Sequence, residues 1–200
     1  MPERANLPSA PRDKYASFAE LAAYETEGLD YRVIARPVPG ARVAIVAPHG
    51  GGIERGTSEL ARVIAGEDFH LYLFEGLKPR GNFKSLHITS RRFDEPRCAD
   101  LLRRSETVIT IHGCAGLHQA VYLGGLHAPL KATLVEKLLE AGIDARLNGH
   151  VFPAIDGDNL CNRGLRGAGV QLELTAGLRR GRPSTFLGPL IRDILLAHHF

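Results

Sequence analysis

Apolar residues along this chain alternate between short continuous runs and segments in which they recur at helical spacing. Runs rich in β-branched residues predict strands, and apolar residues three or four apart predict amphipathic helices. The predicted strands cover residues 31–36, 43–47, 69–74, 106–111 and 169–175. The predicted helices cover residues 17–24, 59–64 with Thr57 or Ser58 as the cap, 96–104, 130–141 and the segment after Pro183-Ser184.

This alternation of strands and helices predicts an α/β fold. A mixed, mostly parallel central sheet with helices on both faces would give three α/β/α layers. A chain of 200 residues is long enough to form one domain with a sizeable core. We therefore expect a single domain over residues 15–200, preceded by a flexible lead-in over residues 1–14, where three prolines occur.

The composition is that of an ordinary soluble protein, with 44% hydrophobic and 24% charged residues and a formal net charge of +3. No apolar stretch approaches the roughly 20 residues that span a membrane. The N-terminus lacks the apolar core of a signal peptide. The scattered cysteines, Cys98, Cys114 and Cys161, fit a reducing compartment and are interpreted as core residues. We expect a cytoplasmic monomer without a membrane partner.

The candidate chemistry begins at His49 and Glu54, which follow the predicted strand 43–47 and are joined by a glycine turn. Open α/β sheets bind ligands at the ends of their strands. An imidazole and a carboxylate at this place suit a divalent metal such as zinc, and glycine lets a ligand approach the backbone closely. The alternative is a glycine-rich turn that carries a surface His and a surface Glu.

His112 and Glu173 occupy similar places on other predicted strands. His112 ends the strand 106–111, and Glu173 lies on the polar side of the strand 169–175. Two imidazoles and one carboxylate from His49, Glu54 and His112 would leave a fourth zinc position open, as in catalytic sites. Glu173 would then be the general base. The alternatives are a hydrogen-bonded core His112 and a solvent-facing Glu173 on an edge strand.

Candidate substrate-binding residues precede the last predicted strand. A guanidinium matches a carboxylate in bidentate fashion, so Arg163 or Arg166, with the neighbouring Asn162, could bind a substrate carboxylate. An ordinary surface role is the alternative. The densest basic pairs are Arg91-Arg92, Arg103-Arg104 and Arg179-Arg180, which are interpreted first as solvated faces and second as attracting a polyanionic substrate.

From about residue 15 onward, the chain resembles the phage-type poly-γ-glutamate hydrolase family. The similar stretches are APHGGGIERGTSELA (47–61), LHITSRRFDEP (86–96), TIHGC (110–114), NLCNRGLRGAGVQLELT (159–175) and the closing helix. Members of that family are similar to compact zinc carboxypeptidases, with a mixed sheet between helices. They are zinc-dependent amidases that cut the γ-glutamyl bond of poly-γ-glutamate.

The resemblance implies one zinc ion per chain on His49, Glu54 and His112, with Glu173 as general base. It also implies an anionic γ-glutamyl polymer, or a related amide, as substrate. Two features depart from the more distant carboxypeptidase plan: four residues separate the first His from its Glu, and Asn162-Arg163 follow the second His instead of preceding it. A phage-derived protein could also leave its host by lysis without a signal peptide.

Three functions are therefore compared. The leading hypothesis is a zinc amidohydrolase that cleaves γ-glutamyl amide bonds with metal-activated water. The enzyme alternative keeps the fold and the metal but acts on peptidoglycan peptides or N-acyl amino acids. The non-enzyme alternative is a phage-related nucleic-acid-binding protein, suggested only by the isoelectric point near 8.9 and the arginine pairs. Aromatic residues are only 6% and no nucleic-acid-binding motif occurs, so no nucleic-acid partner is expected.

Overall fold

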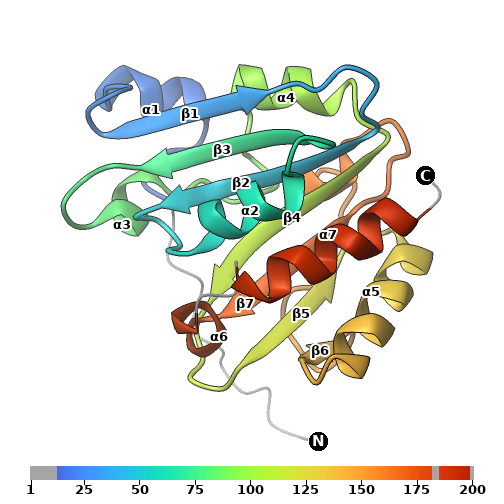
Figure 1. The fold of residues 1–200 in the computed structure, drawn as a ribbon. Coiled ribbons are helices and arrows are strands. Elements are labelled where there is room, and N and C mark those ends of the chain that lie inside the picture. The colour runs from blue at the N-terminus through green and yellow to red at the C-terminus, as the bar shows by residue number, and fades with distance from the viewer. Residues whose placement is uncertain (1–12, 182–184, 199–200) are drawn as a thin grey trace, which may run out of the picture.

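The fold is built on a mixed β-sheet. The computed structural model describes residues 13–181 and 185–198, and over these the sheet has seven strands in the order β1-β3-β2-β4-β7-β5-β6 (Figure 1). The strands are β1 (Tyr31–Arg36), β2 (Val43–Gly51), β3 (His70–Gly76), β4 (Thr107–Cys114), β5 (Ala120–Gly124), β6 (Asp144–Arg146) and β7 (Val170–Thr175). Only the β1–β3 and β5–β7 pairs among these are antiparallel. The predicted mixed, mostly parallel sheet is confirmed.

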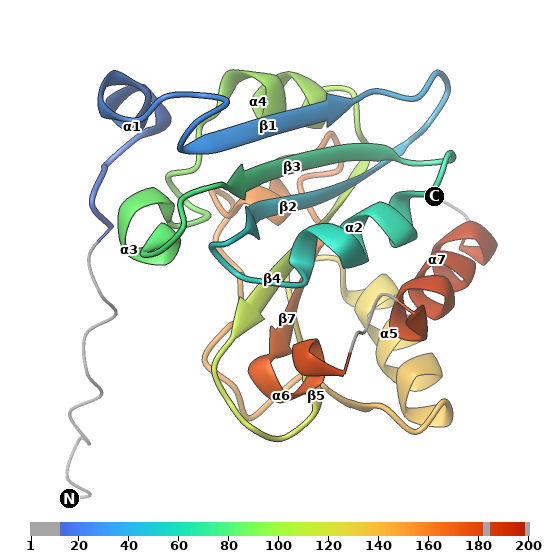
Figure 2. The ribbon, with the colours of Figure 1, turned by 60° about the vertical axis from the view of Figure 1, so that its left-hand side comes forward.

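Helices cover both faces of this sheet, which confirms the three-layer architecture. The helices of the described residues are α1 (Phe18–Tyr24), α2 (Thr57–Ala65), α3 (Asn82–Leu86), α4 (Pro96–Leu102), α5 (Ala128–Glu140), α6 (Ala176–Arg180), α7 (Leu187–Ala197) and a short 3-10 helix, η1 (Leu160–Asn162). Helices α2, α5 and α7 lie together on one face, and α1, α3 and α4 lie toward the other (Figures 1 and 2).

Both faces of the central strands are buried, and the residues that pack into the two hydrophobic clusters are apolar. In β2, Val43, Ile45 and Ala47 pack into the hydrophobic cluster that includes α2, α5 and α7. The alternate residues, Ala44 and Val46, pack into the second cluster, with side chains of α1, α3 and α4. Neighbouring parallel strands β2, β4 and β7 therefore end at the same edge of a rigid sheet.

Two predicted boundaries around the end of β2 are wrong. Strand β2 continues past Ala47 to Gly51, so His49 lies within the strand. The pairing with β3 shifts there from Ala47–Leu73 to Gly50–Glu75, which is a β-bulge. Helix α2 is not capped by a side chain of Thr57 or Ser58, because its N-cap is Gly56 in the left-handed region.

The shortest elements were not predicted. Helices α3 and α6 and strands β5 and β6 have three to five residues each, too few to show a hydrophobic period. The predicted lead-in lies mostly outside the described residues. At its end, the Asp13 carboxylate contacts His87 and Arg92, and Lys14 pairs with Glu25. No helix of the described residues has the length and apolar character needed to cross a membrane.

Candidate metal centre

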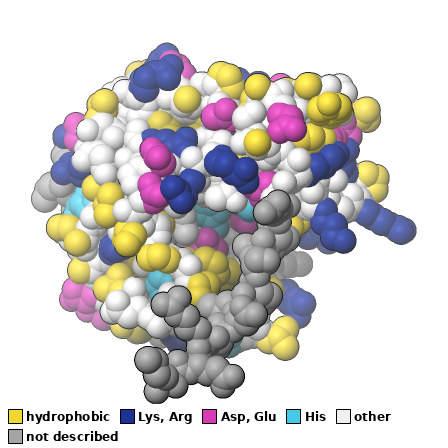
Figure 3. Space-filling model, turned by 180° about the vertical axis from the view of Figure 1, so that it is seen from behind, with side chains coloured by type: hydrophobic (Ala, Val, Ile, Leu, Met, Phe, Trp, Pro, Cys, Tyr) yellow, Lys and Arg dark blue, Asp and Glu magenta, His cyan; other side chains and the backbone are white. Residues whose placement is uncertain are grey.

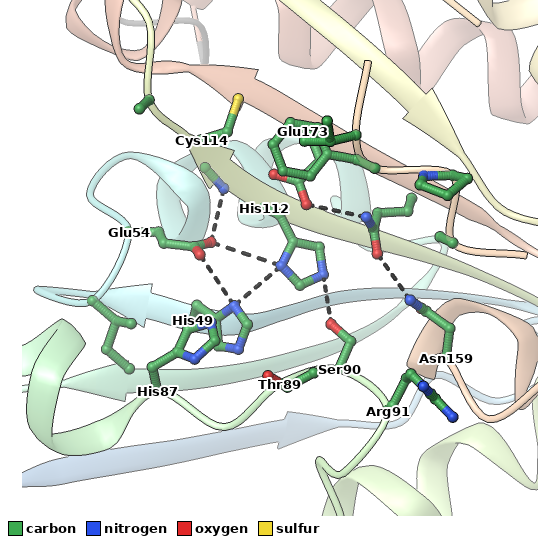
Figure 4. A pocket seen from close by; sticks show the side chains of 18 of the residues that line it. His49, Glu54, His87, Thr89, Ser90, Arg91, His112, Cys114, Asn159 and Glu173 are labelled. Carbon is green, nitrogen blue, oxygen red and sulfur yellow. Dashed lines mark hydrogen bonds and ion pairs between the residues drawn. The ribbon is translucent and has the colours of Figure 1, made fainter. Parts of the chain in front are cut away.

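A pocket of about 780 Å³ lies where β2, β4 and β7 end. His49 comes from β2, His112 from β4 and Glu173 from β7, and Glu54 follows β2 in the turn before α2. His112 and Glu173 are register partners on adjacent parallel strands. The structure thus brings together the four residues predicted as metal ligands and base (Figure 4).

Three of these side chains converge on one point. Nδ1 of His49 lies 3.1 Å from Nδ1 of His112 and 3.2 Å from Oε1 of Glu54. Oε2 of Glu54 lies 3.7 Å from Nδ1 of His112. All three residues are buried, and among the described residues they form the one group of this kind that could hold a metal ion.

The hydrogen-bond partner of Nε2 in each imidazole determines whether Nδ1 can offer a lone pair to a metal. Nε2 of His49 lies 2.9 Å from the carbonyl oxygen of Ile88, which can only accept, so Nε2 carries the hydrogen. Nε2 of His112 lies 3.3 Å from Oγ of Ser90. In the neutral rings, Nδ1 of His49 then presents a lone pair. Nδ1 of His112 presents its lone pair to the same point when its Nε2 donates to the Ser90 hydroxyl, which is the tautomer that metal-bound histidines adopt.

These residues fit zinc. Ligand atoms on a tetrahedral zinc ion at about 2.0–2.1 Å are about 3.3 Å apart, close to the separations found here. Two lone pairs at 3.1 Å repel each other unless a cation or a proton lies between them. Two imidazoles and one carboxylate also form the donor set that zinc favours in catalytic sites.

Glu54 is held in its charged form. Burial alone would raise its pKa, but without a metal the protonated forms of His49 and His112, through charge and hydrogen bonds, outweigh burial and lower the pKa of Glu54 far below its usual range. The backbone N–H of Gly113 also donates to Oε2 of Glu54, at 2.7 Å. Next to it, Oγ1 of Thr57 donates to the Glu54 carbonyl, which fixes the turn that carries this ligand.

Glu173 is in the opposite electrostatic situation. The alternative of a solvent-facing Glu173 on an edge strand is wrong, because β7 lies between β4 and β5 and only 7% of the residue is exposed. Burial, reinforced by the negative charge of Glu54, raises the pKa of Glu173 well above its usual value. Its Oε1 accepts a hydrogen bond of 3.0 Å from Nε2 of Gln171. A carboxyl group in this position can exchange a proton with molecules in the pocket.

The residues predicted to bind substrate do not line this pocket in the described part of the chain. The amide of Asn162 bonds to backbone groups of four other residues and ties their loops together. The guanidinium of Arg163 likewise donates to backbone carbonyls, including that of Phe93. Arg166 bonds to Thr107 at the start of β4, at the other end of the strand from His112. Substrate binding by these three residues stays a prediction.

Other arginines and histidines do line the pocket. Arg91 and Arg179 come from two of the arginine pairs, and His87 stacks against His49 with ring centroids 4.1 Å apart. The guanidinium of Arg179 donates to three backbone carbonyls, whereas that of Arg91 is 61% exposed as a side chain and pairs with Asp156. Arg91 is therefore the lining arginine that can reach a ligand.

The cysteines are buried, as predicted. Cys114 also lines the pocket. Burial and the negative charge of Glu173 raise the pKa of the Cys114 thiol to about 12, so it stays protonated at neutral pH. A thiolate nucleophile is therefore not part of the chemistry that this pocket offers.

Comparison with known proteins gives one consistent result. The family model described as poly-gamma-glutamate hydrolase matches residues 15–184. UPF0714 protein YndL of Bacillus subtilis is 42% identical over 170 residues, which are 84% of this chain and 66% of that protein. The chain spans 66%, 63% and 72% of the lengths of three curated relatives.

Solved structures agree with this result. A bacteriophage poly-γ-glutamate hydrolase superposes with a TM-score of 0.88 at 31% identity, over 92% of this chain and 97% of that chain. The zinc-free apo form of YndL has the same TM-score at 35% identity, over 94% of this chain and all of the other. A candidate carboxypeptidase from Burkholderia mallei, at 15% identity and a TM-score of 0.51, shares the fold over 83% of this chain and 58% of that chain. The predicted family resemblance and carboxypeptidase-like fold are confirmed.

Proposed function

This chain belongs to the poly-γ-glutamate hydrolase family, and we propose that it is a zinc-dependent amidohydrolase that cleaves γ-glutamyl amide bonds. The observation that carries the proposal is the convergence of His49, Glu54 and His112 beside Glu173 in one pocket. The relative described as zinc-free YndL supports zinc as the metal. The similarity to a bacteriophage poly-γ-glutamate hydrolase supports the polymer as the substrate.

Each side chain has a distinct part in this reaction. His49, Glu54 and His112 would hold one zinc ion, which would acidify water to a pKa of about 7 and polarise the amide carbonyl. Glu173, which is not among these ligands, takes a proton from the attacking water and passes it to the departing amine nitrogen. The Gly113 N–H and the Thr57 hydroxyl keep Glu54 and its turn in place for this work.

The pocket also suits the chemistry of the substrate. A γ-linked polymer has methylene groups between its amides and a free carboxylate on each residue. Val151 and Ile155 line the pocket with largely exposed apolar side chains, and Arg91 lines it with a cation. Seen from behind, this face has histidines in the middle, charged side chains above them and hydrophobic ones below (Figure 3). We assign Arg91 to a substrate carboxylate.

Metal analysis and a polymer assay test the proposal together. Purified protein should contain about one zinc ion per chain, and His49→Ala should lose it. Wild-type protein should shorten poly-γ-glutamate, whereas Glu173→Gln should keep zinc and lose hydrolysis. Polymer of unchanged length with zinc-loaded wild-type protein would contradict the substrate. Full activity of Glu173→Gln would contradict the mechanism.

A further inference from the structure

Resting on the function proposed above, we infer that Gln171 and Asn159 are positioning residues for the base. They hold Glu173 through Oε1 and direct its Oε2 to the attacking water. All three side chains line the pocket, and each of these residues is less than one-tenth exposed. Gln171 donates to Oε1 of Glu173. In the close view, a dashed line meets one carboxylate oxygen of Glu173, and the other oxygen is turned away from that line (Figure 4).

The hydrogen bonds that link Cys161, Asn159, Gln171 and Glu173 can have only one donor-to-acceptor direction. The backbone N–H of Cys161 can only donate, and it lies 3.2 Å from Oδ1 of Asn159. Nδ2 of Asn159 therefore faces the next residue and donates to Oε1 of Gln171 at 3.3 Å. The remaining group of Gln171, Nε2, must then donate to Glu173. A backbone donor thus determines the orientation of both amides.

The strand supplies the geometry of the last link. Gln171 and Glu173 are two residues apart on β7 and so project from the same face, while Leu172 projects into the core on the other face. Asn159 is the N-cap of η1 and accepts a hydrogen bond from the backbone N–H of Cys161. The base is therefore fixed to two separate elements, a central strand and the loop before η1.

This arrangement assigns the proton to one atom. Because Oε1 is engaged by Gln171, the proton released when an O–H bond of water breaks is taken up at Oε2. It later leaves Oε2 to form the N–H bond of the departing amine, so Glu173 is regenerated. Neither amide side chain titrates, so neither competes for the proton. Burial strengthens these bonds because the surrounding dielectric is low.

Substitutions of the two amides test the inference. Gln171→Met keeps the length of the side chain and removes the donor. We expect kcat on γ-glutamyl oligomers to fall about 10- to 100-fold, with KM and zinc content within about twofold of wild type. Gln119→Met, at an exposed position outside the pocket, is the matched control and should leave kcat unchanged.

The direction of these hydrogen bonds gives a sharper test at Asn159. Asn159→Asp still accepts from Cys161 but can no longer donate, so Gln171 must turn its carbonyl toward Glu173. We expect Asn159→Asp to lower kcat at least as much as Asn159→Leu, although it is closer in shape to wild type. In a Gln171→Met background, neither substitution should lower kcat further, because the link they act through is gone.

These experiments distinguish failure of the positioning role of Gln171 and Asn159 from failure of the proposed hydrolase function. Active wild-type enzyme with unchanged kcat in Gln171→Met, or with additive losses in the double variant, would overturn the inference alone. Loss of zinc in Gln171→Met would also overturn it, because the residue would then act on the metal site. A wild-type protein that binds zinc but cleaves no γ-glutamyl bond would overturn the proposed function and the inference with it.

Discussion

At the scale of single residues, the hydrogen bonds behind the imidazoles make this pocket a metal site. The Ile88 carbonyl determines which nitrogen of His49 carries the hydrogen, and Ser90 contacts the corresponding nitrogen of His112. Metal ligands need such partners because a ring free to rotate or to change tautomer presents its lone pair only part of the time. The segment 88–90 therefore supports both histidines from behind.

Removal of the Ser90 hydroxyl should weaken metal binding without removing a ligand. We expect Ser90→Ala to raise the Kd for zinc about tenfold, as measured by competition with a chelator. Thr89→Ala is the control, because Thr89 is an exposed neighbour in the same segment whose backbone N–H bonds to Asp13. Equal zinc affinity in Ser90→Ala and Thr89→Ala would show that Ser90 does not support His112.

Arg91 should contribute to substrate affinity more than to turnover. Arg91→Gln removes a cation that can pair with a carboxylate, and we expect KM for poly-γ-glutamate to rise about tenfold with kcat within about twofold. Asp156→Asn releases Arg91 from its ion pair and should lower KM. Arg180→Gln makes the same change of net charge at an exposed position outside the pocket. An equal rise in KM in that variant would indicate long-range attraction instead of contact.

The sequence reveals the metal-ligating side chains of the site better than it reveals the groups that support them or bind substrate. His49, Glu54 and His112 could be predicted to meet because strand ends of a parallel sheet gather at one edge. Ile88 could not be found this way, because it acts through a backbone carbonyl that every residue has. Arg163 lies in the right loop, but its guanidinium binds carbonyl oxygens within the protein, which the sequence alone does not reveal.

At the scale of elements, the bulge in β2 brings His49 to the metal site. Pro48 and His49 together face the single residue Phe74 of β3, since the pairing shifts between Ala47 and Gly50. The continuous apolar run predicted the strand only as far as Ala47, because the proline, histidine and glycines beyond it carry no strand signal. Bulges commonly redirect a side chain next to an active site.

Gly51, two residues after this bulge, is the position near it at which a side chain should do most harm. Its φ is +60°, and an added Cβ would lie 2.7 Å from the Gly76 carbonyl oxygen. Gly51→Ala should reduce the free energy of unfolding by about 2–3 kcal/mol and weaken zinc binding. Gly40→Ala, at φ +77° with open space around it, should lose only about 1 kcal/mol. Urea denaturation measures both; equal losses would show that contact with Gly76 does not matter.

At the scale of the whole molecule, the buried carboxylate of Glu75 connects the sheet to a helix that covers it. Glu75, at the end of β3, accepts hydrogen bonds from Arg32 of β1 and Arg62 of α2. Burial alone would raise its pKa, but hydrogen bonds from Arg32 and Ser58 and the charges of both arginines lower the pKa of Glu75 below the usual value of 4.5. Glu75 thus links the edge strand β1 to helix α2, which follows Glu54 in the chain.

This network predicts how acid affects the fold. A carboxyl whose pKa is lower in the folded chain stabilises the fold fully above its unfolded pKa, near 4.5, and loses that contribution as pH falls through the folded value. Glu75→Gln should therefore cost on the order of 1 kcal/mol at pH 7, since both arginines are about half exposed and screened. Below pH 4 the difference from wild type should shrink. Denaturation at pH 7 and pH 3.5 measures it, and a difference that stays constant between these values would show that ionised Glu75 does not connect the layers.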